Sequence, residues 1–485
     1  MMYIPVLPRF ARLVTRRHFS SISYPWERSN SVMELIESVK SASIAGHAYK
    51  ESMERKAMEL LSGDMKEAAM LIITLHNFGC NASSLLEKIK IKGKGEHLDL
   101  LFRALSECGI TAPPDAEVEI MYAAQTADHP LQVYNYICGI GSYTSTKVID
   151  SLPFLLKRME EIGISNFTPL QILQIAGGVA YVDANSHSGL LNKLCTDLVE
   201  RGLSNITMPD LLDGMAKLSR NYQCTRLLSE FEKELLSHIS SSSLNPEEIC
   251  QAVYIFSRYH RSNNLVMDRI AVNLRRDIGN YDLDKLSRIV LGLSKIGYYN
   301  KAIVDLCGRM VRTFLDKDST ADVMLLTNLY TGFSRFLYHE KIFDIFSEIL
   351  RKEEVFANLQ IHDAVAIVRA YARVHLVDER LFTMLDNKVF SQPMNSDLSM
   401  KLLVAHGKLR YRNPRLQNSL LNNINLKEVE SQIEREKLKL ATERLCLFYP
   451  EITDEPDMEL PRITWQKFEP VRRRMQHIRR RKWTW

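Results

Sequence analysis

The stretch LDKLSRIVLGLSKIGY, residues 283–298, decides the fold of this chain. Its apolar residues Leu286, Ile289, Leu293 and Ile296 recur every three or four positions, which is the spacing of one face of an α-helix. Alternation with period two is scarce elsewhere, and 485 residues include only 20 glycines and 16 prolines. The fold class predicted is therefore all-α.

The end of this stretch, LSKI at 293–296, has relatives along the whole chain. The second residue of each copy lies at positions 76, 106, 138, 177, 216, 257, 294, 334, 372 and 407, and is small in all copies but the first. A small side chain there would let neighbouring helices approach closely. The period near 38 residues is the length of one helix pair with its turns. The sequence thus predicts an α-solenoid of about ten degenerate helix-pair repeats of roughly 38 residues.

The buried stripe of this solenoid can be predicted by shifting the first stretch along the repeat. A shift of 40 residues gives Leu326, Leu329, Phe333 and Phe336; a shift of 78 gives Ala364, Ile367, Tyr371 and Val374. Helix starts are predicted at Asn245, Thr168 and Thr207, because each is a polar residue followed within two positions by proline.

Charge divides the chain more sharply than composition does. The net charge is +5, but residues 1–20 and 471–485 carry four and seven cations and no acid, which leaves −6 on residues 21–470. The division predicted is a mitochondrial transit peptide at 1–20, N-terminal cap helices at 21–64, the solenoid at 65–425, a charged helix and linker at 426–470, and a basic tail at 471–485.

The N-terminal segment has the composition of a mitochondrial transit peptide, with four arginines, several serines and no acid before Glu27. Arg17, Phe19 and Ser20 fit a matrix-peptidase cleavage pattern, so the mitochondrial matrix is the expected location. A disordered basic terminus on a cytosolic protein and a plastid leader are the alternatives. No segment approaches the roughly 18 consecutive apolar residues of a membrane span, so no membrane insertion is expected.

Sequence motifs for catalysis and for cofactor binding are missing. The chain contains no phosphate-binding glycine loop, no dinucleotide fingerprint, no H-E-x-x-H and no G-x-S-x-G. Its eight cysteines include no C-x-x-C pair and suggest neither a zinc site nor a disulfide framework. We therefore expect no catalytic residues, no metal, no cofactor and no enzymatic activity.

A cation follows the small residue in six consecutive copies of the repeat. We call this set the basic ladder: Lys217, Arg258, Lys295, Arg335, Arg373 and Lys408. If the helix pairs stack in register, these side chains form a column. A single strand of nucleic acid could follow this column, with its phosphates neutralised by the cations. The alternative is helix capping, because a cation in the last turn also complements the helix dipole.

The C-terminal tail is a second candidate for nucleic-acid binding. Its cations are Arg472, Arg473, Arg474, Arg479, Arg480, Arg481 and Lys482. Their spacing suits two turns of a basic helix, and Trp483 and Trp485 follow as candidate stacking residues.

The repeated phrase, approximately L-x-x-L-x-x-[SA]-[KR]-[LI]-x-[YH] behind a transit peptide, resembles organellar helical-repeat proteins. These include the octotricopeptide and heptatricopeptide types, the helical part of the FASTK family, and most closely the subunit-six-like proteins of the RNA-editing substrate-binding complex. The resemblance covers roughly residues 65–425. It implies binding of mitochondrial RNA in processing, editing, stability or ribosome assembly. No RAP domain, which ends many of these relatives, is recognisable in residues 427–485.

Two functions remain open from the sequence. The first is a non-catalytic mitochondrial protein that binds single-stranded mRNA or rRNA along the basic ladder, within a ribonucleoprotein complex containing other proteins. The second is a protein scaffold or mitoribosomal subunit, whose acidic body binds proteins while the tail contacts rRNA.

Overall fold

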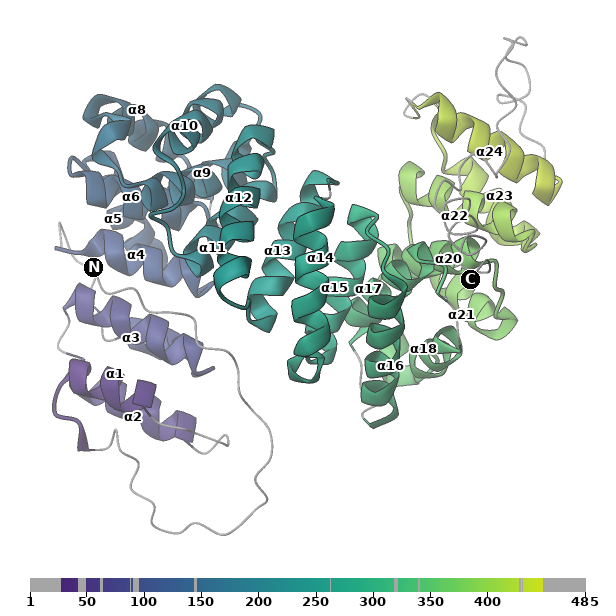
Figure 1. Cartoon of the computed structure of the whole chain (residues 1–485), viewed down its shortest axis with the longest axis horizontal. Helices are drawn as coiled ribbons and strands as arrows, with labels where there is room; N and C mark the ends of the chain where they lie inside the picture. Colours follow the sequence, from purple (N-terminus) through teal and green to yellow (C-terminus); the bar gives the residue numbers. More distant parts are fainter. Residues whose placement is uncertain are drawn as a thin grey trace. The chain divides into compact units, whose positions relative to one another are not determined.

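The computed structural model describes residues 28–41, 49–61, 64–87, 89, 96–143, 146–261, 263–317, 322–338, 341–426, 429 and 431–447. These residues form helices joined by turns, with no strand among them, which confirms the all-α solenoid class (Figure 1). The chain divides into two compact units, Met1–Ser242 and Ser243–Trp485. The predicted transit peptide and basic tail lie outside the described residues.

The first unit consists of two kinds of helix. Its first helices pack one against the next along the chain: α1 (Val32–Ser41), α3 (Met65–Asn77), α4 (Leu98–Glu107), α6 (Pro130–Ile140), α9 (Pro169–Asp183) and α11 (Met208–Ser219). Its second helices cover them: α2 (Tyr49–Leu60), α5 (Pro114–Gln125), α7 (Thr146–Ile149), α8 (Leu152–Ile162), α10 (Ser188–Arg201) and α12 (Thr225–Ser241). Short 3-10 turns occur at η2 (Ser83–Glu87) and η3 (Ile164–Asn166).

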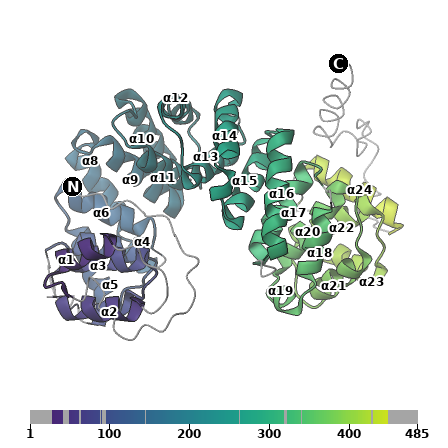
Figure 2. The same ribbon diagram turned by 60° about the horizontal axis from the view of Figure 1, so that its bottom comes forward.

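The second unit repeats this arrangement (Figure 2). Its first helices are α13 (Pro246–Tyr259), α15 (Leu283–Ile296), α17 (Val323–Arg335), α20 (Ile361–Val374), α22 (Ser396–Leu409) and α24 (Gln432–Leu445). Its second helices are α14 (Asn264–Arg276), α16 (Lys301–Lys317), α18 (Ile342–Leu350), α19 (Glu353–Ala357), α21 (Glu379–Phe390) and α23 (Pro414–Asn422). A 3-10 turn, η4 (Ile278–Asn280), precedes α15.

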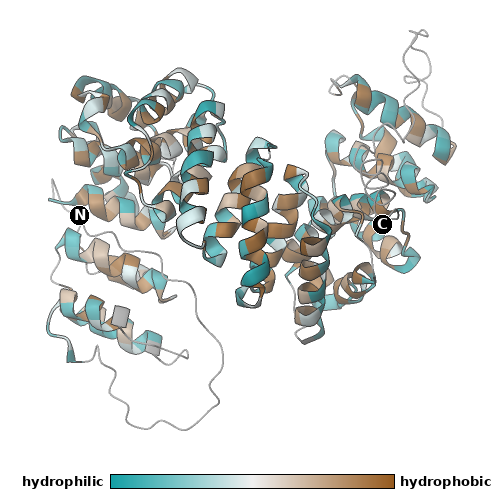
Figure 3. Cartoon of the chain, in the orientation of Figure 1, coloured by the Kyte–Doolittle hydropathy of each residue, from teal (hydrophilic) through white to brown (hydrophobic). Residues whose placement is uncertain are grey.

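The predicted stripe is the core between first helices. Its members in α15 and α17, and Phe336 directly after α17, are all buried, and so are Ala364, Ile367 and Tyr371 in α20. Val374 is half-buried, because it is the last residue of α20 and lies at the edge of the layer. In Figure 3 the helices accordingly carry hydrophobic and hydrophilic residues on different sides.

Small residues set how closely the first helices pack. A Cβ added to Gly407 of α22 would lie 2.5 Å from Cα of Ala441 in α24. A Cβ added to Gly141, at the end of α6, would lie 2.3 Å from Cα of Gly178 in α9. No side chain larger than hydrogen fits at these two positions without moving a backbone.

The predicted helix starts are confirmed. Asn245 and Thr168 both form capping boxes. In each, the side chain of the cap residue accepts a hydrogen bond from the backbone N–H of the N3 residue, and the N3 side chain accepts one from the backbone N–H of the cap residue. Thr207 precedes α11, and its hydroxyl donates to Asp210 at 2.8 Å. These local signals fix where the first helix of each pair begins.

The charged helix expected after residue 426 is α24, and it packs against α22 as the preceding first helices pack against each other. The other boundaries of the sequence-based division, at residues 64 and 425, remain predictions. The exact number of repeats, about ten with a period near 38 residues, also remains a prediction.

Candidate nucleic-acid interface

The basic ladder lies at equivalent points of the fold. Arg258, Lys295, Arg335, Arg373 and Lys408 each belong to the last turn of a first helix in the second unit. Because α13, α15, α17, α20 and α22 pack in succession, these helix ends follow one another along the unit. All five side chains are half-buried.

Neighbouring cations act on one another through this half-buried environment. Burial lowers the pKa of Lys295, and the positive charges of Arg335 and Arg258 lower it further. Burial likewise lowers the pKa of Arg335, with a contribution from Arg369. An arginine stays protonated at physiological pH, so the shift of Arg335 expresses an unfavourable electrostatic energy and not a loss of charge.

Arg373 is the most strongly affected member of the ladder. Burial lowers its pKa, and so do the neighbouring charges of Arg369 and Arg335. Its Nη1 donates a hydrogen bond to Oγ of Ser334 at 3.1 Å. The ladder thus connects α17 to α20 through one side-chain contact.

Arg369 is a cation that the repeat pattern did not single out. It lies one turn before Arg373 on α20, half-buried, and its pKa is lowered by burial even though Asp397 and Glu434 act in the opposite direction. The i, i+4 spacing of Arg369 and Arg373 was the available signal, because it places both on one helix face.

We call Lys295, Arg335, Arg369 and Arg373 the cation cluster. In the described parts of the chain, no carboxylate forms an ion pair with Lys295, Arg335 or Arg373. Capping accounts for one cation at one helix end, but it does not account for several cations that destabilise each other. An anion placed beside them would relieve that repulsion.

Further cations lie at the C-terminal end of the second unit. Arg410 follows α22, and Arg444 is in the last turn of α24; burial and the charge of Arg410 lower the pKa of Arg444. Nη2 of Arg412 donates to Sγ of Cys446 at 3.1 Å. Arg410, Arg412 and Arg444 therefore add cations near the end of the described part of this unit.

The ladder residue of the first unit is different. Nζ of Lys217 forms an ion pair with Asp213 at 2.9 Å. Burial alone would lower the pKa of Lys217, but the carboxylate of Asp213 raises it above its usual value. The charge of Lys217 is therefore already compensated within α11.

A second compensated cation of the first unit is Arg103. It donates to Glu107 at 2.8 Å, and its guanidinium lies 4.8 Å from the ring centroid of Tyr134. Burial would lower its pKa, but Cys138, Glu107 and Tyr134 raise it. Lys217 and Arg103 therefore each have a carboxylate partner, unlike Lys295, Arg335 and Arg373 of the second unit.

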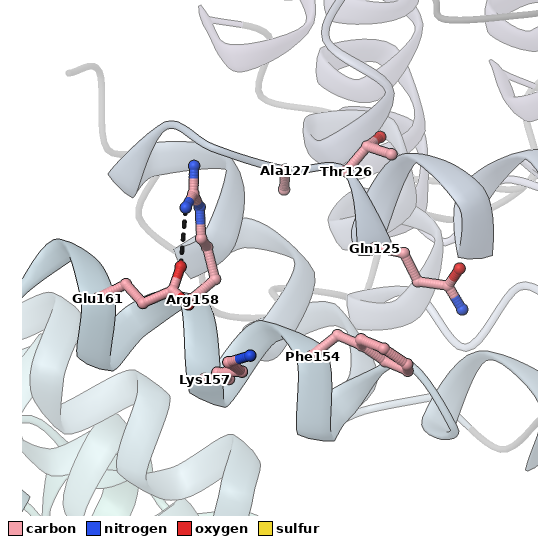
Figure 4. A pocket seen from close by; sticks show the side chains of 7 residues that line it. All are labelled: Gln125, Thr126, Ala127, Phe154, Lys157, Arg158 and Glu161. Atoms are coloured by element: carbon pink, nitrogen blue, oxygen red, sulfur yellow. Dashed lines mark hydrogen bonds and ion pairs between the residues drawn. The ribbon is translucent and has the colours of Figure 1, made fainter.

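A shallow hollow of about 270 Å³ lies between α5 and α8 (Figure 4). Its lining comprises Gln125, Thr126, Ala127, Phe154, Lys157, Arg158 and Glu161. Arg158 and Glu161 form an ion pair at 2.8 Å, and the Phe154 ring is 56% exposed. The lining offers one aromatic face and a few surface charges.

The described residues contain no group of three or more His, Cys, Asp or Glu side chains that could hold a metal ion. Nor do they include a helix long and apolar enough to cross a membrane.

Part of the chain matches the model of a known protein family. The model of the RNA-editing substrate-binding complex 8 protein family matches residues 160–403, half of the chain, a span that includes the ladder from Lys217 to Arg373. A comparison with curated proteins finds no match. The predicted resemblance to proteins of the RNA-editing substrate-binding complex is confirmed, and the chain belongs to the RNA-editing substrate-binding complex 8 protein family.

Proposed function

We propose that this chain is a non-enzymatic subunit of an RNA-editing complex in the mitochondrial matrix, where it holds single-stranded RNA. The family match supports the role in RNA editing. The arginine-rich, acid-free composition of residues 1–20 supports the mitochondrial location. The observation that carries RNA binding is the succession of half-buried cations at the ends of adjacent first helices, of which Lys295, Arg335 and Arg373 form no ion pair with a carboxylate among the described residues.

The RNA backbone lies along the ends of α13, α15, α17, α20 and α22 in this proposal. Phosphates replace the missing carboxylates beside Lys295, Arg335 and Arg373, with Arg258 and Lys408 extending the track on either side. Packed helices are about 8–10 Å apart, so successive cations meet a strand at intervals that a flexible backbone can match. A single strand adapts to such spacing more readily than a duplex, whose phosphates are fixed by helical geometry.

Specificity is not required for this kind of contact. Lysine and arginine contacts to phosphate neutralise charge and release counterions, whichever bases the strand carries. The structure therefore supports a subunit that retains RNA, while other proteins of the complex or base pairing with another RNA supply sequence selection. The basic tail, residues 471–485, is proposed as an additional contact of the same type.

A protein-binding role is the second candidate, and the first unit favours it. Its charges at Lys217 and Arg103 are already paired. Val118, Tyr122 and Phe154 are each at least half exposed on α5 and α8, which pack against each other. Exposed apolar side chains suit contacts with other subunits of the complex better than contacts with phosphate.

The test is the salt dependence of RNA binding. Lys295, Arg335 and Arg373 are all replaced by glutamine in the full chain, and binding to a 30-nucleotide single-stranded RNA is followed by fluorescence anisotropy from low to moderate salt. Each lost phosphate contact reduces the slope of log K against log salt by about 0.7, so the triple variant should lose roughly 2 from this slope.

A matched control removes the same charge from the second helices of the same unit. Arg275 in α14, Arg309 in α16 and Arg380 in α21 are all exposed, and their replacement by glutamine should leave the slope unchanged. Equal loss in both triple variants would mean that net charge alone drives binding. An unchanged slope in the first variant would overturn the proposed track.

A further inference from the structure

Two cysteines of the first unit meet where consecutive second helices pack. Cys195 lies within α10, and Cys224 is the N-cap residue of α12. The segment before α12 is held to its surroundings by two hydrogen bonds. Tyr222 donates to Oδ1 of Asn192 at 2.6 Å, and Asn221 donates to the carbonyl of Ala180 at 3.2 Å. These two bonds attach the segment that carries Cys224 to α10 and to the end of α9.

The thiols differ in environment although they interact directly. The Cys195 thiol donates a hydrogen bond to the Cys224 sulfur, which lowers the pKa of Cys224 and raises that of Cys195. Backbone amides of Leu227 and Arg226, in the first turn of α12, lower the pKa of Cys224 further. Cys195 is 1% exposed, whereas Cys224 is half-buried.

This arrangement is unlike that of five other cysteines in the described chain. Burial raises the pKa of the thiol in Cys80, Cys108, Cys138, Cys250 and Cys307. Such thiols stay protonated and unreactive. Cys224 has instead the features of a reactive cysteine, namely partial exposure, a helix N-terminus and a second thiol in contact.

We propose that Cys195 and Cys224 form a redox-modifiable dithiol that a peroxide converts into an intramolecular disulfide. The Cys224 thiolate attacks one peroxide oxygen, the O–O bond breaks, and Cys224 becomes a sulfenic acid while hydroxide leaves. The Cys195 thiol then attacks the Cys224 sulfur, and an S–S bond forms as the hydroxyl leaves with the Cys195 proton as water. Two thiols are oxidised by two electrons, and one peroxide is reduced to two waters.

The product would covalently join α10 to α12. This inference does not depend on the proposed RNA track, because both cysteines belong to the first unit and the cation cluster belongs to the second. Oxidation would restrict relative movement of two consecutive helix pairs and leave the basic ladder chemically unchanged.

The test uses the full, reduced chain treated with hydrogen peroxide, blocked with N-ethylmaleimide and digested with trypsin without reduction. Cys195 and Cys224 fall in separate tryptic peptides, residues 194–201 and 221–226. Mass spectrometry should find these two peptides linked, in monomeric protein, at peroxide levels that leave the buried Cys307 as a free thiol. Oxidation without this linked pair, or a linkage between two chains, would overturn the proposal.

Two variants separate the chemical steps. Cys195→Ser should stop at the sulfenic acid, which dimedone traps on peptide 221–226, and Cys224→Ser should leave Cys195 reduced. Circular dichroism melting checks that both variants fold.

A kinetic measurement needs no variant. An ordinary thiol of pKa about 8.5, as in the unfolded chain, is roughly 3% thiolate at pH 7. Because the pKa of Cys224 is lowered in the folded chain, a larger fraction of it is thiolate there, and iodoacetamide should modify it about tenfold faster in the folded chain than in the urea-unfolded chain. Equal or slower modification in the folded chain would contradict the assigned reactivity.

Discussion

Replacing Arg335 by glutamine separates a ligand site from helix capping, because the two interpretations predict opposite changes in stability. Arg335 is the last residue of α17, where the helix dipole stabilises a cation by about 0.3–1 kcal/mol. If capping were its role, Arg335→Gln would destabilise the chain by that amount. If Arg335 belongs to an anion site, removing it relieves repulsion with the rest of the cation cluster.

The size of the relief follows from Coulomb's law. Two unit charges about 10 Å apart, the spacing of packed helices, repel by roughly 1.7 kcal/mol at an effective dielectric constant near 20. Partial exposure and screening reduce this to about 0.5 kcal/mol for each of the three other cluster members. The sum of about 1.5 kcal/mol exceeds the lost dipole interaction, so Arg335→Gln should stabilise the RNA-free chain by roughly 1 kcal/mol.

The assay is thermal unfolding followed by circular dichroism at about 20 mM and 500 mM salt. The apparent midpoint should rise in the variant at low salt and should equal that of the wild type at high salt, where the screening length is only a few ångströms. Adding single-stranded RNA should then stabilise the wild type more than the variant. A midpoint that falls at low salt would show that Arg335 stabilises the RNA-free chain as a helix cap and does not belong to an anion site.

Three further predictions concern the scaffold that positions these helices, and each is measured as a change in the free energy or midpoint of unfolding. Gly141→Ala should destabilise the first unit by about 1–3 kcal/mol, because the new Cβ would meet the Gly178 backbone at 2.3 Å. Asn245→Ala should cost about 1 kcal/mol through loss of the capping box of α13. Glu107→Gln should destabilise the first unit by about 1 kcal/mol, because the half-buried guanidinium of Arg103 loses its charged partner but keeps its hydrogen bonds to Asn135 and Gln174.

Their controls are equally specific. Gly189 of α10 has nothing within 4 Å of an added Cβ, so Gly189→Ala should be neutral or stabilising. A stable Gly141→Ala variant would mean that α6 and α9 can separate at little cost. If Asn245→Ser were as harmful as Asn245→Ala, the side-chain oxygen would not be the stabilising group. Mutating the exposed Glu161, which pairs with the exposed Arg158, should change stability little by comparison.

Much of the fold could be predicted from the sequence because the repeat encodes its own packing. The apolar spacing at 286, 289, 293 and 296 placed the core of the second unit correctly, and polar residues before prolines located the starts of α9, α11 and α13. These are local signals, each set within one turn or one repeat. The division of the array after Ser242 was not predicted, since it depends on which helix pairs pack against each other.

The candidate site was only partly predictable for the same reason. The third position of the phrase located Lys295, Arg335 and Arg373, because register in a solenoid brings equivalent positions side by side. Pairing of Lys217 with Asp213 could have been read from the i, i+4 spacing, yet the ladder treated all six cations alike. The charge environment of Arg369 in α20 depends on Asp397 in α22 and Glu434 in α24. A repeat pattern in the sequence does not show that these three residues lie near one another.

RNA binding along the basic ladder is tested most directly by ultraviolet cross-linking of the tagged protein in its own mitochondria. Both the RNA and the cross-linked peptides are then identified. RNA bound along the basic ladder should give cross-links to mitochondrial RNA in peptides near Arg258, Lys295, Arg335, Arg373 and Lys408. Cross-links confined to the tail and to ribosomal RNA, or no cross-linked RNA at all, would contradict RNA binding along the basic ladder.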